Sequence, residues 1–193
     1  MNRHAMIFVL AMLAGVFIIP AIADAGLCVW RLPDRDIKEI YGADSYKTIL
    51  VDVSPAHKEQ IEQRLGAKLD PDESQFRFWP VYKKGVRVGT VSTHLTKADY
   101  GAIEVVIALE HEVNGKNARV KEIRIQRDRE KARKAIRSAE FLGQFTGKTS
   151  KDPLEVGKDI RPADGTKRTS HAIVFSVKKQ LIAFEVLMAS QAD

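Results

Sequence analysis

The C-terminal part of the chain carries the pattern that most restricts its fold. A polar segment with a glycine, residues 159–172, is followed at once by a long apolar helix. The apolar positions of this helix recur at helical spacing, at Ile173, Val177, Leu181, Phe184 and Met188. Residues with this spacing lie on one face of a helix, and that face must be buried. Because a hydroxyl side chain commonly caps the first turn, the pattern predicts a cap at Thr169 or Ser170.

The start of this helix has the features of a phosphate-binding site. The first N–H groups of a helix have no partner within it, and they carry the positive end of the helix dipole. Gly165 would let a ligand approach the backbone closely, and Lys167 and Arg168 add two cations. An ordinary helix cap has the same residues, so this segment alone leaves both interpretations open.

Two further segments upstream extend this pattern. Residues 141–148 read Phe-Leu-Gly-Gln-Phe-Thr-Gly-Lys, and residues 152–154 read Asp-Pro-Leu. Together with residues 159–172 they resemble the FMN-binding domain family. That family includes the flavin-carrying subunits of the Rnf and sodium-translocating NADH:quinone reductase complexes and many small extracytoplasmic relatives. The resemblance extends loosely back to Val29. It implies electron transfer with FMN as cofactor, in or beside a membrane redox complex.

The family's motif, Ser/Thr-Gly-Ala-Thr-x-Ser-Ser-x-Ala, falls on a defined set of residues. In order, its named positions are Asp164, Gly165, Thr166, Lys167, Thr169, Ser170 and Ala172. The resemblance implies that the first six of these residues bind the cofactor. It also implies a contact from Tyr100 and Gly101, which lie where the family's sheet faces the flavin, with Tyr100 stacked on the ring. The alternative for Tyr100 is a tyrosine on the rim of the core.

One departure from the family changes the expected attachment. Where the family's threonine can carry FMN through a phosphoester bond, this chain has Lys167. An amine has no hydroxyl to esterify, so that covalent linkage is excluded. The resemblance then implies FMN held non-covalently, with Lys167 paired to the phosphate by a charge-assisted contact. The alternative is a domain of the same fold that has lost its cofactor and serves as an accessory or interaction module of a redox system.

The N-terminal segment has the composition of a secretory signal peptide. A short basic start is followed by an almost wholly apolar run, and small residues suited to cleavage precede Asp24 and Gly26. We expect residues 1–23 to direct export and residues 24–193 to form a periplasmic or otherwise extracytoplasmic domain. The alternative is an uncleaved membrane anchor, because the apolar run is just long enough to span a bilayer.

Composition excludes several kinds of site. The single cysteine, Cys28, rules out an internal disulfide and a cysteine-based zinc site. The five histidines lie far apart, and the chain has no haem-attachment motif, no His-Glu-x-x-His and no Gly-x-Ser-x-Gly. The sequence therefore predicts no metal site and gives no support for a hydrolytic enzyme. The family resemblance implies an electron carrier rather than an enzyme with its own substrate. An unrelated periplasmic ligand-binding or enzymatic activity is a third alternative.

Charge points to the kind of partner. The formal net charge of +6 suits a phosphate ligand or an acidic partner surface, and export argues against nucleic acid. Cations are concentrated in the segment from Lys116 to Arg137. The simpler interpretation is a solvated strand and helix surface. The alternative is a docking face for an acidic redox partner, where opposite charge would raise the rate of encounter.

The remaining patterns predict an α+β fold in one domain. Its expected elements are a strand at 48–53, a helix from Ser54 to Gly66, two strands within 76–91, an interior strand at 102–109, a turn at Asn114-Gly115, a strand at about 119–126 with a bulge near Lys121, and a helix capped by Asp128 that reaches Phe145. These elements predict a twisted, largely antiparallel sheet with helices packed on it.

Overall fold

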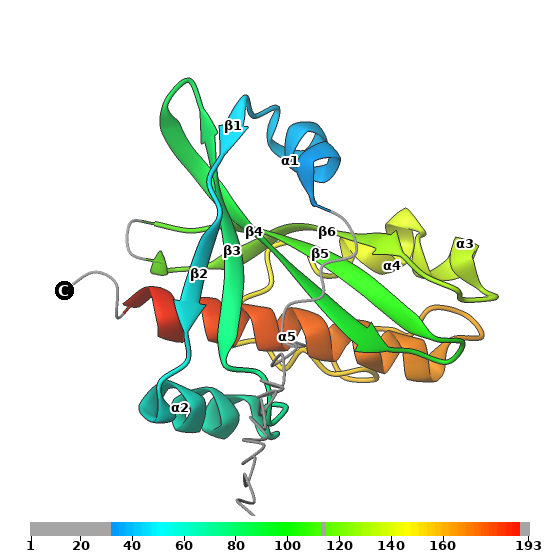
Figure 1. Cartoon of the computed structure of the whole chain (residues 1–193). Coiled ribbons are helices and arrows are strands. Elements are labelled where there is room, and N and C mark those ends of the chain that lie inside the picture. Colours follow the sequence, from blue (N-terminus) through cyan, green and yellow to red (C-terminus); the bar gives the residue numbers. More distant parts are fainter. Residues whose placement is uncertain (1–31, 113–114, 190–193) are drawn as a thin grey trace, which may run out of the picture.

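Helices and strands alternate irregularly along the chain (Figure 1). In order they are α1 (Asp34–Tyr41), β1 (Ser45–Tyr46), β2 (Ile49–Asp52), α2 (Pro55–Leu65), β3 (Gln75–Lys83), β4 (Val86–Lys97), β5 (Ala102–Glu110), β6 (Arg119–Arg127), α3 (Arg133–Ile136), α4 (Ala139–Gly143) and α5 (Lys167–Ala189). The computed structural model describes residues 32–112 and 115–189. The predicted signal peptide or anchor and part of the predicted Asn114-Gly115 turn therefore lie outside the described residues.

The strands form one antiparallel, six-stranded sheet in the order β1–β3–β4–β5–β6, with β2 also paired to β3. The apolar strand β5 has a neighbour on each side, as its composition predicted. The predicted bulge is also present, because Ala108 pairs with Glu122 and Leu109 with Val120, which leaves Lys121 as an extra residue. The predicted α+β class with a largely antiparallel sheet is confirmed.

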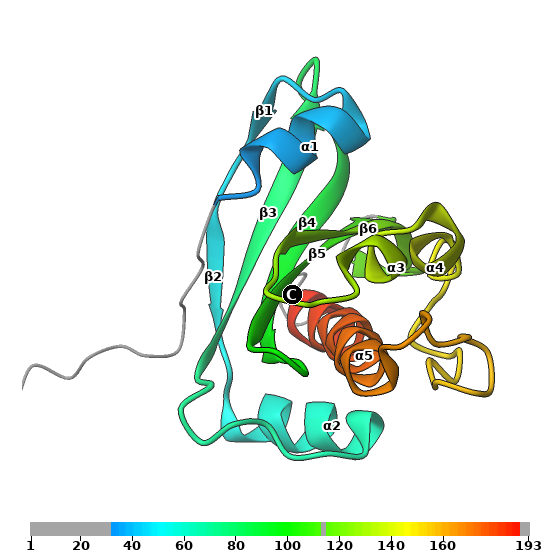
Figure 2. The same ribbon diagram turned by 90° about the vertical axis from the view of Figure 1, so that its right-hand side faces the viewer.

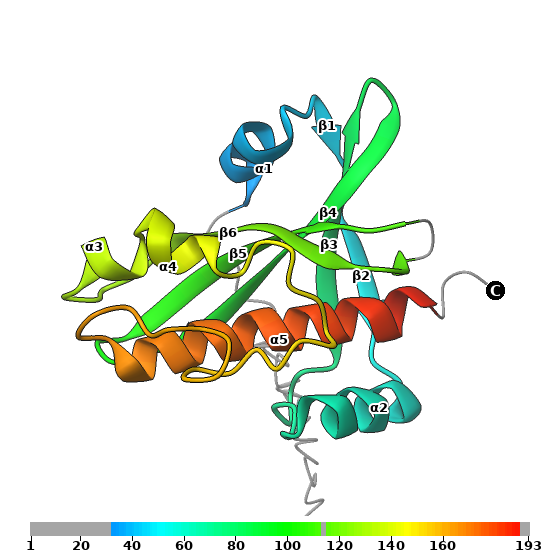
Figure 3. The same cartoon turned by 180° about the vertical axis from the view of Figure 1, so that it is seen from behind.

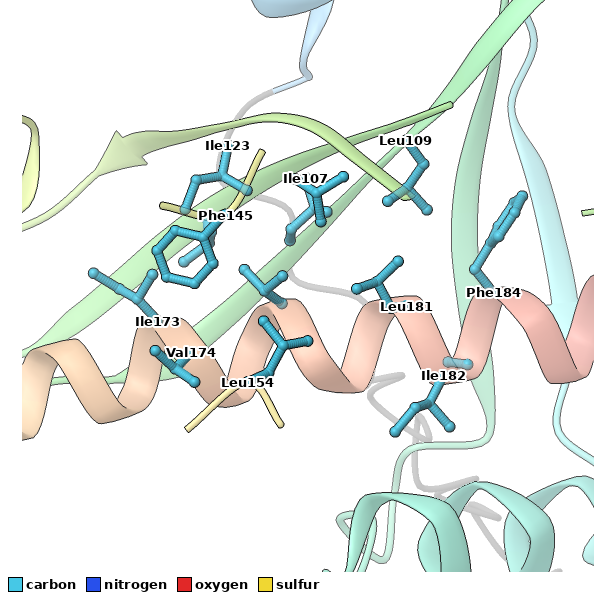
Figure 4. Packing of buried hydrophobic residues seen from close by; sticks show 14 of the residues in the cluster. Ile107, Leu109, Ile123, Phe145, Leu154, Ile173, Val174, Leu181, Ile182 and Phe184 are labelled. Carbon is cyan, nitrogen blue, oxygen red and sulfur yellow. The ribbon is translucent and has the colours of Figure 1, made fainter. Parts of the chain in front are cut away.

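Helix α5 crosses one face of the sheet and supplies much of the main core (Figures 2 and 3). The predicted face is buried, at Ile173, Val177, Leu181, Phe184 and Met188. Sheet residues Ile107, Leu109 and Ile123 belong to the same cluster (Figure 4). Burial extends beyond one face, since Ile182 and Ala183 are buried as well. The helix is therefore an interior helix rather than a surface helix with a single apolar face. Within the described residues, no helix is both long and apolar enough to cross a membrane.

The opposite face of the sheet is covered by α1 through a smaller cluster that includes Ile37, Tyr41 and Trp79. The Tyr41 hydroxyl donates a hydrogen bond to the Leu109 carbonyl at 2.8 Å, and burial raises the pKa of Tyr41. Gly89 lies directly beneath this contact. A Cβ at Gly89 would lie 2.5 Å from the Leu109 carbonyl oxygen and 2.6 Å from the Tyr41 ring, so the close approach requires glycine.

The predicted helix from Ser54 to Gly66 is confirmed as α2, with the predicted residues at both of its ends. The Ser54 hydroxyl accepts a hydrogen bond from the His57 N–H at 3.1 Å, and Gly66 ends the helix with a φ of 71°. The predicted helix from Asp128 to Phe145 is wrong, because two short helices, α3 and α4, take its place.

Asp128 does not cap a helix, because its carboxylate is buried and paired with two arginines. It lies 2.6 Å from Arg137 and 3.1 Å from Arg133. Ser138 instead caps α4 by accepting the Phe141 N–H at 3.1 Å. Tertiary ion pairing has thus overridden the helical pattern of this segment.

We expect Gly89→Ala to lower the free energy of unfolding by about 1–3 kcal/mol, because neither the Leu109 carbonyl nor the buried Tyr41 ring can move away cheaply. Gly143→Ala is the matched control, since its added Cβ meets nothing within 4 Å and alanine favours a helix. Denaturant unfolding of both variants measures the difference. Equal destabilisation of the two proteins would contradict this account.

Candidate functional site

Helix α5 begins at Lys167, so the predicted caps Thr169 and Ser170 lie inside its first turn. Thr166 precedes the helix, and its carbonyl accepts the Ser170 N–H at 2.7 Å. Gly165 has a φ of 68°, in the left-handed region that favours glycine. The predicted cap is wrong, because the Thr169 hydroxyl contacts Asp99 and Glu130 and the Ser170 hydroxyl accepts the Ala163 N–H just ahead of the helix.

Thr169 is fully buried and lies against two carboxylates that come from other segments. Its hydroxyl is 3.0 Å from Asp99 Oδ2 and 2.7 Å from Glu130 Oε2. Its backbone N–H donates to the same Asp99 oxygen at 3.3 Å. Glu130 is only 4 % exposed and also accepts the Tyr100 backbone N–H at 2.9 Å. These contacts join the β4–β5 turn, the segment before α3 and the start of α5 (Figure 1).

Thr166 and Ser170 form a second buried group of hydroxyls. Their oxygens lie 3.0 Å apart, and the Thr166 hydroxyl donates to the Ala163 carbonyl at 2.8 Å. The Ala163 N–H donates in turn to the Ser170 hydroxyl at 3.0 Å. Three predicted site residues, Thr166, Thr169 and Ser170, therefore have their hydroxyls buried and bonded within the protein.

The other predicted site residues lie at or near the surface, and they are Asp164, Gly165, Lys167, Tyr100 and Gly101. The ring of Tyr100 is half exposed, and the Lys131 ammonium lies 4.7 Å from its centroid. Gly101 has a φ of 140°, and a Cβ there would meet only the Arg129 side chain, at 3.5 Å. The fold brings Tyr100 beside the start of α5, because Glu130 accepts the Tyr100 N–H and also contacts Thr169. Contact of Tyr100 and Gly101 with a flavin stays a prediction.

These residues fit a flavin only in part. An exposed aromatic ring and the exposed cation of Lys167 could serve a flavin ring and a phosphate. The buried part of the motif does not fit a phosphate, because Asp99 already accepts the Thr169 N–H and Glu130 adds a second carboxylate. Ligand binding by the predicted residues stays a prediction.

The upstream half of the motif supports the loop that leads into α5. The Gln144 side chain accepts the Arg161 N–H at 2.8 Å and donates to the Arg161 carbonyl at 3.1 Å. Lys148 pairs with Asp159 at 2.9 Å, and the Phe145 ring is fully buried. These residues position the segment before α5 by hydrogen bonding and packing.

Sequence reasoning missed Asp99 and Glu130. Asp99 stands next to Tyr100 in a polar turn, and Glu130 stands in a cation-rich segment, so each has the local appearance of a solvated acid. Only the burial of Glu130 and its contact with Thr169 identify it as part of the site. The one local signal for a role of Glu130 is its position between Arg129 and Lys131. An acid at this position could equally be a solvated residue that balances the two positive charges.

A second polar cluster lies under the middle of α5. Lys179 is 2 % exposed and pairs with Glu73 at 2.5 Å. It also lies 3.4 Å from His94 Nε2, while His94 Nδ1 lies 2.8 Å from the Ser176 hydroxyl. An ammonium only donates, so Nε2 accepts and Nδ1 carries the hydrogen. Burial, followed by the Lys179 charge, lowers the pKa of His94 to about 3.

This cluster resembles a serine–histidine pair but lacks the access that nucleophilic catalysis needs. Ser176 is fully buried, and its hydroxyl donates to the Ala172 carbonyl at 2.8 Å within the helix. We therefore assign the cluster a role in burying Lys179 rather than in chemistry.

Two cavities open at other places on the molecule. One, of about 290 Å³, is lined by charged residues of α1 and β6, among them Arg35, Glu39 and Arg124. The other, of about 480 Å³, lies near the end of α5 and includes Lys116, Lys151 and Glu185. Neither is lined by the predicted site residues. Within the described part of the chain, no group of three or more histidine, cysteine and acidic residues is arranged to hold a metal ion.

Comparison with known proteins supports the fold. No protein-family model matches the sequence, and a search among curated proteins finds no significant match. Among solved structures, the fold is similar to that of NqrC from Shewanella oneidensis, with a TM-score of 0.54 over 82 % of this chain and 88 % of that chain. The two sequences are 16 % identical, so the likeness concerns the fold alone.

We expect His94→Gln to make stability less sensitive to acid. The pKa of His94 is about 3 in the fold against an ordinary value of 6.5, so between these pH values the unfolded chain binds a proton that the folded chain does not. Proton uptake by the unfolded chain therefore lowers the free energy of unfolding as the pH falls from 6.5 towards 3, by up to about 1.4 kcal/mol per pH unit, and has no effect above pH 6.5. Denaturant unfolding at neutral and acidic pH measures it, and equal acid losses in both proteins would contradict it.

Proposed function

We propose that this protein is an exported, extracytoplasmic component of an electron-transfer system, without a flavin attached at the motif position. The observation that carries the proposal is the placement of the motif segment at the start of α5, beside Tyr100, in an NqrC-like fold. Lys167 at the attachment position removes the hydroxyl that a phosphoester requires. The component is an electron carrier or its accessory rather than an enzyme with its own substrate.

The first form of this function is a carrier that binds FMN non-covalently. A flavin needs a wall for its ring, a phosphate site and hydrogen bonds that tune its potential. Tyr100 is half exposed and offers a ring for stacking. Lys167 is exposed at the first position of α5 and offers a cation for the phosphate.

The second form is a cofactor-free accessory or interaction module of a redox system. The specific observation in its favour is the pair of carboxylates, Asp99 and Glu130, at the buried side of the helix start. They already bond the Thr169 groups that a phosphate would use.

In either form the protein would dock on an acidic partner, such as a redox protein or a subunit of a membrane redox complex. Much of the charge between Lys116 and Arg137 is neutralised within the fold, because Arg124 pairs with Glu39 and Arg137 pairs with Asp128. Arg129 and Lys131 form no ion pair with any described residue, and both are exposed beside the β4–β5 turn. The proposed docking face therefore centres on this turn rather than on all of β6.

Acid precipitation tests how a flavin is held. We expect that any absorbance near about 450 nm, the flavin band, passes into the supernatant, because Lys167 cannot form the phosphoester. Protein from its native host and protein mixed with FMN should both be examined. A native spectrum with the flavin band supports the first form, and colourless protein that takes up no FMN supports the second. Yellow colour retained by the precipitated polypeptide would contradict non-covalent binding and direct attention to Thr166 or Thr169.

Export is tested by the intact mass of the protein recovered from its native host. We expect the mature chain to begin at Asp24 or Gly26, because small residues suited to a signal peptidase precede both positions. Recovery of this shortened chain from the extracytoplasmic fraction is the expected result. A full-length chain in the membrane would establish an anchor, and a full-length chain in the cytoplasm would sink the extracytoplasmic assignment.

A further inference from the structure

The buried side of the α5 start already contains two negative charges of the protein itself. We propose that Asp99 and Glu130 occupy the place that the phosphate of a flavin nucleotide would need, so that the native chain has no phosphate site there. This inference rests on the proposed function and chooses its cofactor-free form.

The contacts around Thr169 show why the position is taken. Asp99 Oδ2 accepts the Thr169 N–H at 3.3 Å and lies 3.0 Å from its hydroxyl oxygen, so it is next to both polar groups. Asp99 also donates its own N–H to the Thr169 hydroxyl at 3.3 Å. A threonine hydroxyl has a single proton, for which Glu130 Oε2 at 2.7 Å is the nearer acceptor, while the Asp99 N–H donates to one of its lone pairs. A phosphate would have to displace Asp99 to reach either group.

Glu130 adds a charge that cannot move aside easily. It is 4 % exposed, lies 2.7 Å from the Thr169 hydroxyl and accepts the Tyr100 N–H at 2.9 Å through its other oxygen. Withdrawing Glu130 would leave the Tyr100 N–H without this partner, so the β4–β5 turn depends on it. An incoming phosphate would therefore meet a fixed buried carboxylate. Two negative charges in contact repel each other more strongly where water is excluded than in solution.

The same arrangement supplies what the helix itself requires. An acidic group at a helix N-terminus satisfies free N–H groups and interacts favourably with the helix dipole. In a protein that binds a nucleotide, the phosphate can serve this purpose. Here Asp99 serves this purpose for the buried Thr169 N–H, and Glu130 accepts the Thr169 hydroxyl beside it.

The experiment compares binding of FMN and of riboflavin, which lacks the phosphate, by quenching of flavin fluorescence. For the wild type we expect no preference for FMN. The double variant Asp99→Ala with Glu130→Gln frees the Thr169 N–H and removes both charges, so it should prefer FMN over riboflavin by about ten-fold or more, the usual effect of a charge-assisted contact. Asp99→Ala alone should gain less, because Glu130 remains. Relative to chloride at equal ionic strength, inorganic phosphate should raise the thermal midpoint of the double variant more than that of the wild type, because it binds the opened site only in the folded form. Any general effect of phosphate as a salt is the same for both proteins.

Asp164→Asn is the matched control. Asp164 is an exposed acid just before α5 and makes no hydrogen bond to Thr169, so its loss changes net charge without opening the helix start. Asp99→Asn removes the charge while keeping an acceptor, and it serves where Asp99→Ala does not fold, as judged by circular dichroism. We expect a smaller gain from it, and a further gain when Glu130→Gln is added.

Three results would overturn the inference. One is a wild type that already prefers FMN by about ten-fold, since its phosphate would then bind with both carboxylates in place; the flavin-carrying form of the function would stand. Another is a folded variant that lacks both carboxylate charges, with Glu130→Gln added to the Asp99 substitution, and that shows neither a preference for FMN nor specific stabilisation by phosphate. The last is an equal gain in Asp164→Asn. Failure of the proposed function itself is seen separately, in the location of the exported chain.

Discussion

Burial of helix α5 is the constraint on which the rest of the structure depends. The sheet covers one side of it, and α2 and the segment before α5 lie on other sides (Figure 3). A helix in the interior cannot leave its polar groups to water, so each needs a partner from the protein. Lys179 pairs with Glu73, Ser176 contacts His94, and Thr169 contacts two carboxylates. These polar clusters along α5 are thus consequences of its burial.

This constraint also decides what the candidate site can do. In a helix that starts at the surface, the first N–H groups are open to a ligand. Here the Thr169 end of the first turn faces inward and is bonded by Asp99 and Glu130, while Lys167 faces solvent. Lys167 is exposed on the outer side of this turn, and Tyr100 and Lys131 are exposed on the neighbouring segments that carry Asp99 and Glu130. One turn of helix therefore has a closed inner side and an open, basic outer side.

Predictions from the sequence held where a local pattern and tertiary packing agreed. The cap at Ser54, the interior strand β5 and the extra residue Lys121 follow from hydroxyl capping, continuous apolar composition and broken alternation. They failed where a buried ion pair competed with helix propensity, as at Asp128. Residues 128–145 have the apolar spacing of one helix, but the ion pairs of Asp128 with Arg133 and Arg137 hold the start of this segment in another conformation.

The sequence by itself determined the apolar spacing that buries α5, and it determined that Lys167 cannot carry a phosphoester, because both are properties of residue type and order. Only the tertiary structure decided which groups meet at the start of that helix. Asp99 is separated from Thr169 by 70 residues along the chain and Glu130 by 39. No local pattern encodes contacts between residues so far apart in the sequence. They form because the fold places the β4–β5 turn and the segment after β6 beside the start of the buried helix.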